Sequence, residues 1–177
     1  MKKILVATDG SDHAVRAVEL ASDLAGKYDA ELIILHVTSS RPLSVAERHM
    51  AEVEFAEQVG QYVTENLADV ATGYGNLLRS QPILRYHSEV DQIIHRVVGE
   101  RVVESAKTIA HSKGITEVQT ILETGDPTTV IIETAKKTNA NLIVLGSRGL
   151  GTVKGVLLGS VSSKVNHLSD INVITVK

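Results

Sequence analysis

The chain has 177 residues, enough for one domain with a sizeable hydrophobic core, and its 43% hydrophobic and 22% charged residues are typical of a globular protein. A net charge of -3 and only 3% aromatic residues disfavour a nucleic-acid partner, which needs a basic surface or stacking side chains. The absence of cysteine excludes disulfides, thiolate metal sites and cysteine nucleophiles, and no apolar run is long enough to cross a membrane. We therefore expect a cytoplasmic protein with neither a membrane nor a nucleic acid as its partner.

Strand and helix patterns alternate along most of the chain. Short apolar, partly β-branched runs predict strands at residues 4–7, 31–37, 117–123, 142–145 and 171–176. Apolar residues at helical spacing predict helices at residues 14–25, 127–135 and 160–168, and a longer helix that opens at Ser88 and ends at Gly114. This alternation implies a parallel sheet that is covered by helices on both faces.

We predict an α/β fold of the Rossmann-like kind, with five parallel strands in the order 3-2-1-4-5 and helices on both faces. Residues 1–177 are interpreted as a single domain, because the chain shows no internal repeat and no low-complexity tract. Residues from about 42 to 87 are more polar and less regular, which predicts a variable insertion made of one helix and a mobile loop. Because it follows the second strand, this insertion should lie over or beside the carboxyl ends of the strands.

Glycines cluster between the fourth strand and the last predicted helix. Gly146, Gly149 and Gly159 follow the apolar run 142–145, and Ser160 comes directly after the last of them. Glycine lets a ligand approach the main chain closely, and the N-terminus of a helix favours an anion. The spacing matches neither the dinucleotide fingerprint nor the P-loop, which needs a Gly-Lys-Ser/Thr step. Phosphate binding is the favoured interpretation, although a glycine-rich turn without a ligand gives a similar pattern.

Several polar side chains near this crevice have two open interpretations. Asp9, at the end of the first strand, can accept hydrogen bonds from ribose hydroxyls or cap the next helix, a role that Ser11 could fill instead. Ser160 and Ser162 can donate to phosphate oxygens, cap the last helix, or do both. His36 is interpreted as a strand-end residue that packs or forms a hydrogen bond beneath the site.

Other charged groups are weaker candidates. Arg148 and Lys154 lie within the glycine run and either balance phosphate charge or stay solvated. His87, Asp91 and His95 share one face of the long helix, but they have no evident fourth ligand, so we predict no metal site. No motif places a catalytic residue.

The glycine run resembles the nucleotide-binding signature of the universal stress protein family, and residues 4–11, 35–37 and 125–127 resemble other segments of that family. The resemblance implies the adenine nucleotide α-hydrolase-like form of the fold, ATP bound with Mg²⁺ held through the phosphates, and a homodimer formed through the last strand. It implies that Asp9 lies near the ribose and Val37 at the adenine. The other residues that it assigns to the nucleotide are Thr8, Gly146, Arg148, Gly149, Gly159, Ser160, Val161 and Ser162.

These observations are compatible with three functions. The first is an ATP-binding module in stress response or signalling, in which ATP changes dimer geometry or partner affinity. The second is a slow ATPase that uses the same pocket, which the lack of a Walker lysine and of a placed general base disfavours. The third is an interaction protein that works without a nucleotide and keeps the loop as scaffold, which the intact glycine spacing disfavours.

Overall fold

The computed structural model describes residues 2–44, 48–50, 53, 56, 82–150 and 158–177 of the chain. They fall into two compact units, Met1–Ser39 with Gly99–Lys177 and Ser40–Val98. The helix and loop predicted at 42–87 lie mostly outside the described residues, as does Lys154. In the part of the chain that is described, no helix is both long and apolar enough to cross a membrane.

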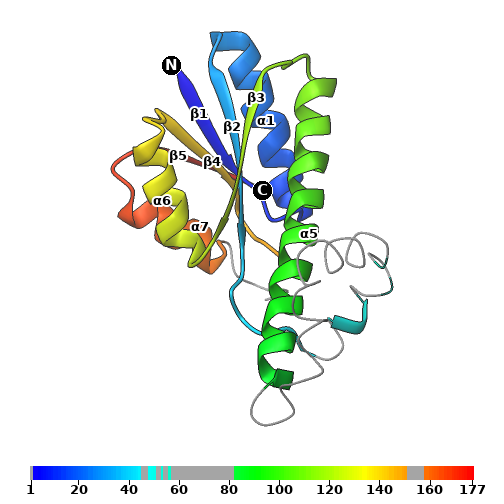
Figure 1. Cartoon of the computed structure of the whole chain (residues 1–177). Coiled ribbons are helices and arrows are strands. Elements are labelled where there is room, and N and C mark those ends of the chain that lie inside the picture. Colours follow the sequence, from blue (N-terminus) through cyan, green and yellow to red (C-terminus); the bar gives the residue numbers. More distant parts are fainter. Residues whose placement is uncertain (1, 45–47, 51–52, 54–55, 57–81, 151–157) are drawn as a thin grey trace. The chain divides into compact units, whose positions relative to one another are not determined.

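The first unit is built on a parallel sheet of five strands, shown in Figure 1. The strands are β1 (Lys3–Ala7), β2 (Glu31–Thr38), β3 (Val118–Thr124), β4 (Leu142–Gly146) and β5 (Asn172–Val176). Their spatial order is β3-β2-β1-β4-β5, and every neighbouring pair is parallel. The predicted fold class and strand order are therefore confirmed.

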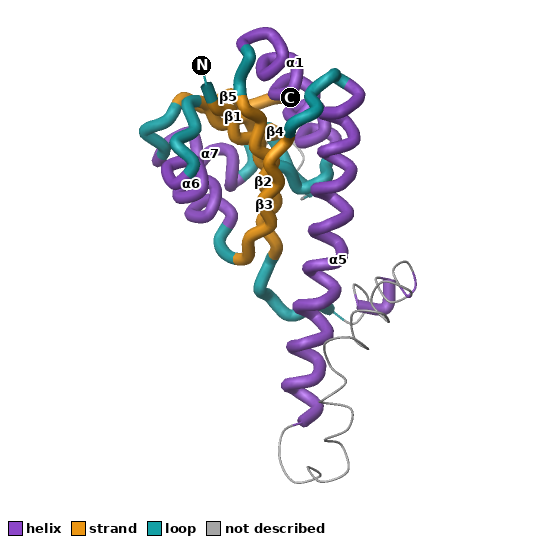
Figure 2. Tube along the Cα trace, turned by 45° about the horizontal axis from the view of Figure 1, so that its top comes forward, coloured by secondary structure: helices purple, strands orange, loops and turns teal. Residues whose placement is uncertain are grey.

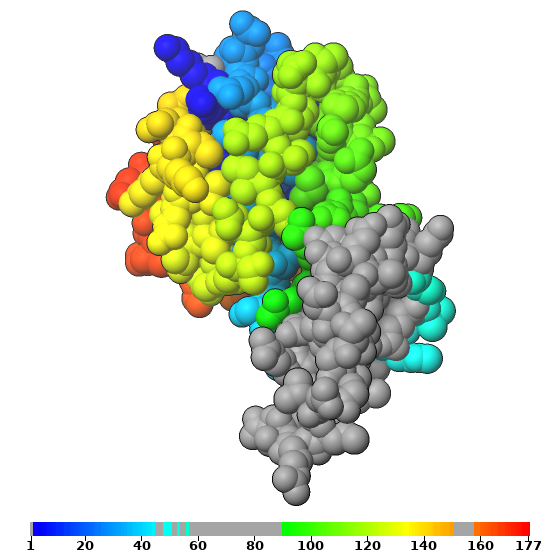
Figure 3. Space-filling view, viewed as in Figure 1, coloured from blue at the N-terminus to red at the C-terminus, as the bar shows by residue number. Residues whose placement is uncertain are grey.

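Helices cover both faces of the sheet (Figure 2). They are α1 (Asp12–Tyr28), α5 (Pro82–Ser112), α6 (Pro127–Lys137) and α7 (Ser160–Leu168). Side chains alternate along each strand, so the two faces carry separate cores. Ile4 and Val6 pack with α1 and α5, whereas Leu5 and Ala7 pack with α6 and α7. The space-filling view shows α6, β3 and the part of α5 in this unit forming one continuous surface (Figure 3).

The long helix α5 begins earlier than the sequence predicts. It starts at Pro82 and not at Ser88, because proline suits the first helical position, where its missing N–H would have had no partner. It runs without interruption through Gly99 and ends before Gly114, whose φ of 84° suits a residue beyond a helix end. At Gly99 a Cβ would lie 2.8 Å from side-chain atoms of Leu122 and Thr38, so glycine lets this helix cross β2 and β3 closely.

The second unit holds the described members of the histidine group that was considered for zinc. The buried Asp91 carboxylate accepts hydrogen bonds from Arg48 Nε at 2.9 Å and from Leu43 N–H at 3.1 Å. His95 Nε2 lies 2.9 Å from the Arg41 carbonyl. These side chains are therefore engaged with the protein, and the side chain of His87 lies outside the described set.

Candidate functional site

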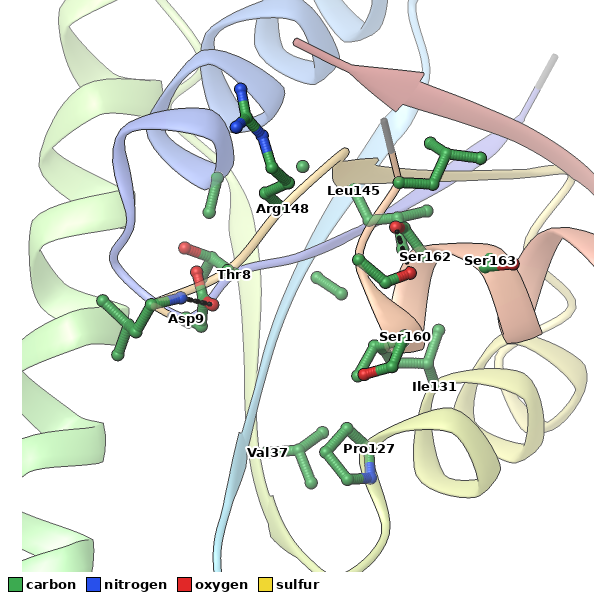
Figure 4. A pocket seen from close by; sticks show the side chains of 18 of the residues that line it. Thr8, Asp9, Val37, Pro127, Ile131, Leu145, Arg148, Ser160, Ser162 and Ser163 are labelled. Carbon is green, nitrogen blue, oxygen red and sulfur yellow. Dashed lines mark hydrogen bonds between the residues drawn. The ribbon is translucent and has the colours of Figure 1, made fainter. Parts of the chain in front are cut away.

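A cavity of about 680 Å³ opens at the carboxyl ends of the strands in the first unit (Figure 4). All ten residues that the sequence assigned to a nucleotide line it: Thr8, Asp9, Val37, Gly146, Arg148, Gly149, Gly159, Ser160, Val161 and Ser162. The other described residues that line it were missed by sequence reasoning: Ala7, Ala14, Leu35, Pro127, Ile131, Leu145, Leu150, Leu158 and Ser163. Open parallel sheets commonly bind ligands at this edge.

One end of the cavity is apolar. Val37, at the end of β2, lies beside Pro127, the first residue of α6, and Ile131 stands one turn further along that helix (Figure 4). Ile131 is almost fully buried in the core cluster beneath. Two features of the sequence could have indicated Pro127 and Ile131 as lining residues: the proline at a helix start and the apolar face of α6. A flat apolar group such as a planar ring suits this end of the cavity.

The other end is polar and is formed by the first turn of α7. The N-cap residue is Gly159, which has no side chain that could cap the helix. The first N–H groups of a helix have no partner within it, and their partial positive charge favours an anion. Ser160 and Ser163 are exposed and line the cavity one turn apart, and the exposed Arg148 adds a positive charge. This end can hold a phosphate group.

The buried residue Ser147 positions this helix terminus. Its N–H donates to the Val176 carbonyl at 2.6 Å, and its carbonyl accepts the N–H of Gly159 at 2.6 Å. The hydroxyl of Ser162 also donates to the Ser147 carbonyl, at 2.9 Å. Of the interpretations left open for Ser162, this contact favours a hydrogen bond within the protein, because the hydroxyl has a single hydrogen to donate. No sequence motif indicated a role for Ser147.

Gly146 has a packing role. A Cβ there would lie 2.8 Å from the carbonyl carbon of His13 and 2.9 Å from the nitrogen of Ala14, both in the main chain of α1. Backbone cannot move aside as a flexible side chain can, so only glycine lets β4 pass this close to α1. Gly146 lines the cavity, but the need for glycine at this position arises from the protein.

The turn between β1 and α1 brings Asp9 and Thr8 to the cavity. Asp9 Oδ1 accepts from the Ser11 hydroxyl at 2.6 Å, and Oδ2 accepts from the Leu150 N–H at 3.2 Å. Ser11 caps α1, as predicted. His36 Nδ1 lies 2.7 Å from the Thr8 carbonyl, so of the two interpretations of His36, packing or a hydrogen bond, the hydrogen bond is present, and this nitrogen is the donor.

Asp126 holds the start of α6, and hence the apolar end of the cavity. Its Oδ1 accepts from the Thr129 N–H and from the Thr129 hydroxyl, each at 3.0 Å. The backbone hydrogen bond from Thr129 is the main reason why the pKa of this carboxyl is lowered, and Lys164 adds a smaller effect in the same direction. Asp126 is therefore the N-cap residue of α6.

The model of the universal stress protein family matches residues 1–177. This chain belongs to that family. Universal stress protein YxiE of Bacillus subtilis is 34% identical over 175 residues, which is 99% of this chain and 98% of the relative.

Two solved members of the family share the fold. One is a universal stress protein in complex with cAMP, with a TM-score of 0.59 and 23% identity, covering 99% of this chain and 95% of the other. The second is the protein from Archaeoglobus fulgidus in complex with dAMP, with a TM-score of 0.57 and 18% identity, covering 100% and 98%. Both likenesses span essentially the whole chain.

The side chains of Ser162 and Ser160 should contribute differently to the free energy of unfolding of this protein. Ser162→Ala removes a buried hydrogen bond to Ser147 and should lower the free energy of unfolding by about 1 kcal/mol. Ser160→Ala is the matched control, since the exposed side chain of Ser160 should change stability by less than about 0.5 kcal/mol. Urea denaturation measures both variants, and equal losses would contradict this division of roles.

Asp126 should make the stability of α6 dependent on pH. Because folding lowers its pKa from 3.8, the carboxylate stabilises the fold above that value and loses its contribution as the pH falls through the lower folded pKa. Asp126→Ala should therefore lower the Tm at pH 7, and the difference from wild type should shrink as the pH falls below 3.8. Glu133→Ala, an exposed acid in the same helix, is the control. A Tm difference for Asp126→Ala that does not change with pH would refute the capping argument.

Proposed function

We propose that this universal stress protein is an ATP-binding module that holds Mg²⁺ through the nucleotide phosphates. The observation that carries the proposal is a single cavity with an apolar end at Val37, Pro127 and Ile131 and an open helix N-terminus at its other end. A nucleotide has the same division, with a flat base at one end and phosphates at the other. The cavity volume of about 680 Å³ lies in the range of small-molecule sites.

In this proposal the adenine lies between Val37 and α6, and the phosphates lie against the first turn of α7. Ser160 and Ser163 donate to phosphate oxygens, and Arg148 balances part of their charge. The complexes of two family members with cAMP and dAMP support an adenine nucleotide as the ligand. ATP occupancy would then set the affinity for a partner in stress response or signalling.

Hydrolysis is expected to be slow. Among the described residues that line the cavity, Asp9 has the only carboxylate, and both of its oxygens already accept hydrogen bonds from the protein. The single carboxylate is therefore engaged with the protein, and no motif places a residue to activate an attacking water. A binding role therefore fits the cavity better than an ATPase does.

Calorimetric titration with ATP and Mg²⁺ tests the proposal. The wild type should bind, and the double variant Ser160→Ala/Ser163→Ala should bind roughly tenfold more weakly, because two hydroxyl donors are lost. Ser105→Ala on α5 removes an exposed hydroxyl that does not line this cavity, and it should bind ATP as the wild type does. No heat of binding and no rise in Tm at millimolar ATP would refute the proposed function.

We also propose a homodimer formed through β5. This strand is an edge of the sheet, and its residues Val173, Ile174, Thr175 and Val176 are all partly buried within the chain. The opposite edge, β3, exposes polar residues such as Gln119 and Glu123, which disfavour pairing between copies. Sedimentation equilibrium at micromolar concentration should give twice the chain mass of 19.0 kDa, whereas a monomer would refute the dimer.

A further inference from the structure

The chain leaves strand β1 at a main-chain carbonyl that a side chain satisfies. Thr8, the residue after β1, donates its N–H to the Leu35 carbonyl of β2 at 2.9 Å. Among the described residues, no main-chain N–H donates to the Thr8 carbonyl. The donor is instead His36 Nδ1, at 2.7 Å. Thr8 is 6% exposed, so water has little access and an unpaired carbonyl there would be costly. His36 therefore supplies a hydrogen bond that the sheet does not.

This contact fixes both the proton and the orientation of the His36 ring. A carbonyl oxygen can only accept, so Nδ1 carries the proton in the neutral ring. A charged ring keeps the same N–H, so the bond does not depend on the charge state. The ring lies directly against α5, because a Cβ at Gly99 would be only 3.0 Å from His36 Cδ2. The ring is thus confined between the end of β1 and the glycine of α5.

The Thr8 carbonyl belongs to the peptide unit that enters the cavity. A peptide unit is planar, so the direction of this carbonyl also sets the direction of the Asp9 N–H and the place of the Asp9 Cα. Thr8 and Asp9 both line the cavity and lie next to each other there (Figure 4). His36 is not among the described lining residues, since Val37, its neighbour in β2, faces the cavity and side chains alternate along a strand. Any effect of His36 on a ligand therefore passes through the turn.

We propose that His36 is a positioning residue of the nucleotide site, whose Nδ1–H holds the Thr8 carbonyl and so sets the turn that presents Thr8 and Asp9 to the ligand. The part of the proposal that concerns a ligand rests on the proposed function, since this turn lines the proposed nucleotide cavity. The hydrogen bond itself belongs to the protein without a nucleotide. The competing explanation is that the ring only fills space between β2 and α5.

The first experiment needs no nucleotide and locates the proton on the ring. Nitrogen NMR of the imidazole side chains at alkaline pH, where each neutral ring has one proton, should show His36 protonated at Nδ1. The spectrum of His36→Asn lacks one ring and so identifies the signals of His36. A proton on Nε2 would mean that Nδ1 is not the donor, and it would overturn the proposal.

The second experiment uses two replacements of His36 that separate hydrogen bonding from shape. Asparagine is smaller than histidine, but its amide nitrogen occupies nearly the place of Nδ1 and can donate to the Thr8 carbonyl. Leucine fills about the volume of the ring and cannot donate. In calorimetric titration, His36→Asn should bind ATP within about twofold of the wild type, and His36→Leu roughly tenfold more weakly, because the buried carbonyl loses its donor.

A ring that only fills space gives the reverse order, with leucine the better replacement. That order, or equal affinities of the two variants, would refute the positioning role. His111→Leu is the control, because it removes an exposed imidazole from α5 and should bind ATP as the wild type does.

Amide hydrogen exchange without nucleotide keeps the test independent of ATP. The Thr8 N–H should exchange roughly tenfold faster in His36→Leu than in the wild type or His36→Asn, because the turn is held by one bond fewer. The Val6 N–H, in the middle of β1, should stay protected in all three proteins and shows that the sheet is intact. Equal exchange of the Thr8 N–H in all three would overturn the proposal. If the wild type does not bind ATP, the proposed function fails, and the ring proton and the exchange rates still decide on His36.

Discussion

The cavity depends on the main-chain groups of one buried residue, Ser147. Its N–H is bound to the end of β5 and its carbonyl to the start of α7, so it joins the last strand, the glycine loop and the last helix. Ser147 is 1% exposed, so water cannot replace either partner, and breaking one bond would leave a buried polar group unsatisfied. The direction in which the N-terminus of α7 points is therefore set by backbone hydrogen bonds from the sheet.

The two ends of the cavity come from two successive crossovers of the same sheet. The apolar end follows β3, where the Gly125 N–H donates to the Thr38 carbonyl at 3.2 Å and Asp126 caps α6. The polar end follows β4 and belongs to α7. Ile131 of α6 and Val165 of α7 lie in one core cluster, so the two helices share a packed interface. A ligand that spans the cavity touches both helices, and its binding is coupled to how they pack.

The fold followed from the sequence because its determinants are local and periodic. Each predicted strand exists to within two residues at either end, and the alternation of strands with helices leaves few topologies once crossovers are right-handed. The start of α5 was missed because Ser88 and Asp91 make a plausible capping pattern inside a helix that Pro82 had already opened. A capping pattern describes what a residue can do, and it cannot tell whether the helix has begun.

The lining of the cavity was predicted only in part, for a different reason. Thr8 and Asp9 follow β1 and Val37 lies at the end of β2, and residues at the carboxyl ends of parallel strands reach the ligand edge. Ile131 and Ser163 reach the cavity through the rotation of their helices, and Ser147 acts through main-chain groups that are the same in every residue. Neither the rotation of a helix nor the role of a main-chain group can be inferred from the type of residue.

The three glycines of the loop show how far a sequence pattern can be trusted at a site. The pattern treats Gly146, Gly149 and Gly159 as one signature, yet Gly146 is set against the backbone of α1, and Gly149 against the carboxylate of Asp9. At Gly159 the protein itself has room for a methyl group, so a requirement for glycine there would have to come from what binds in the cavity. Two of the three positions therefore build the loop, and membership of a binding motif does not by itself make a residue a ligand contact. What the motif specifies is the path of the main chain, and the path of the main chain is what presents N–H groups to a phosphate.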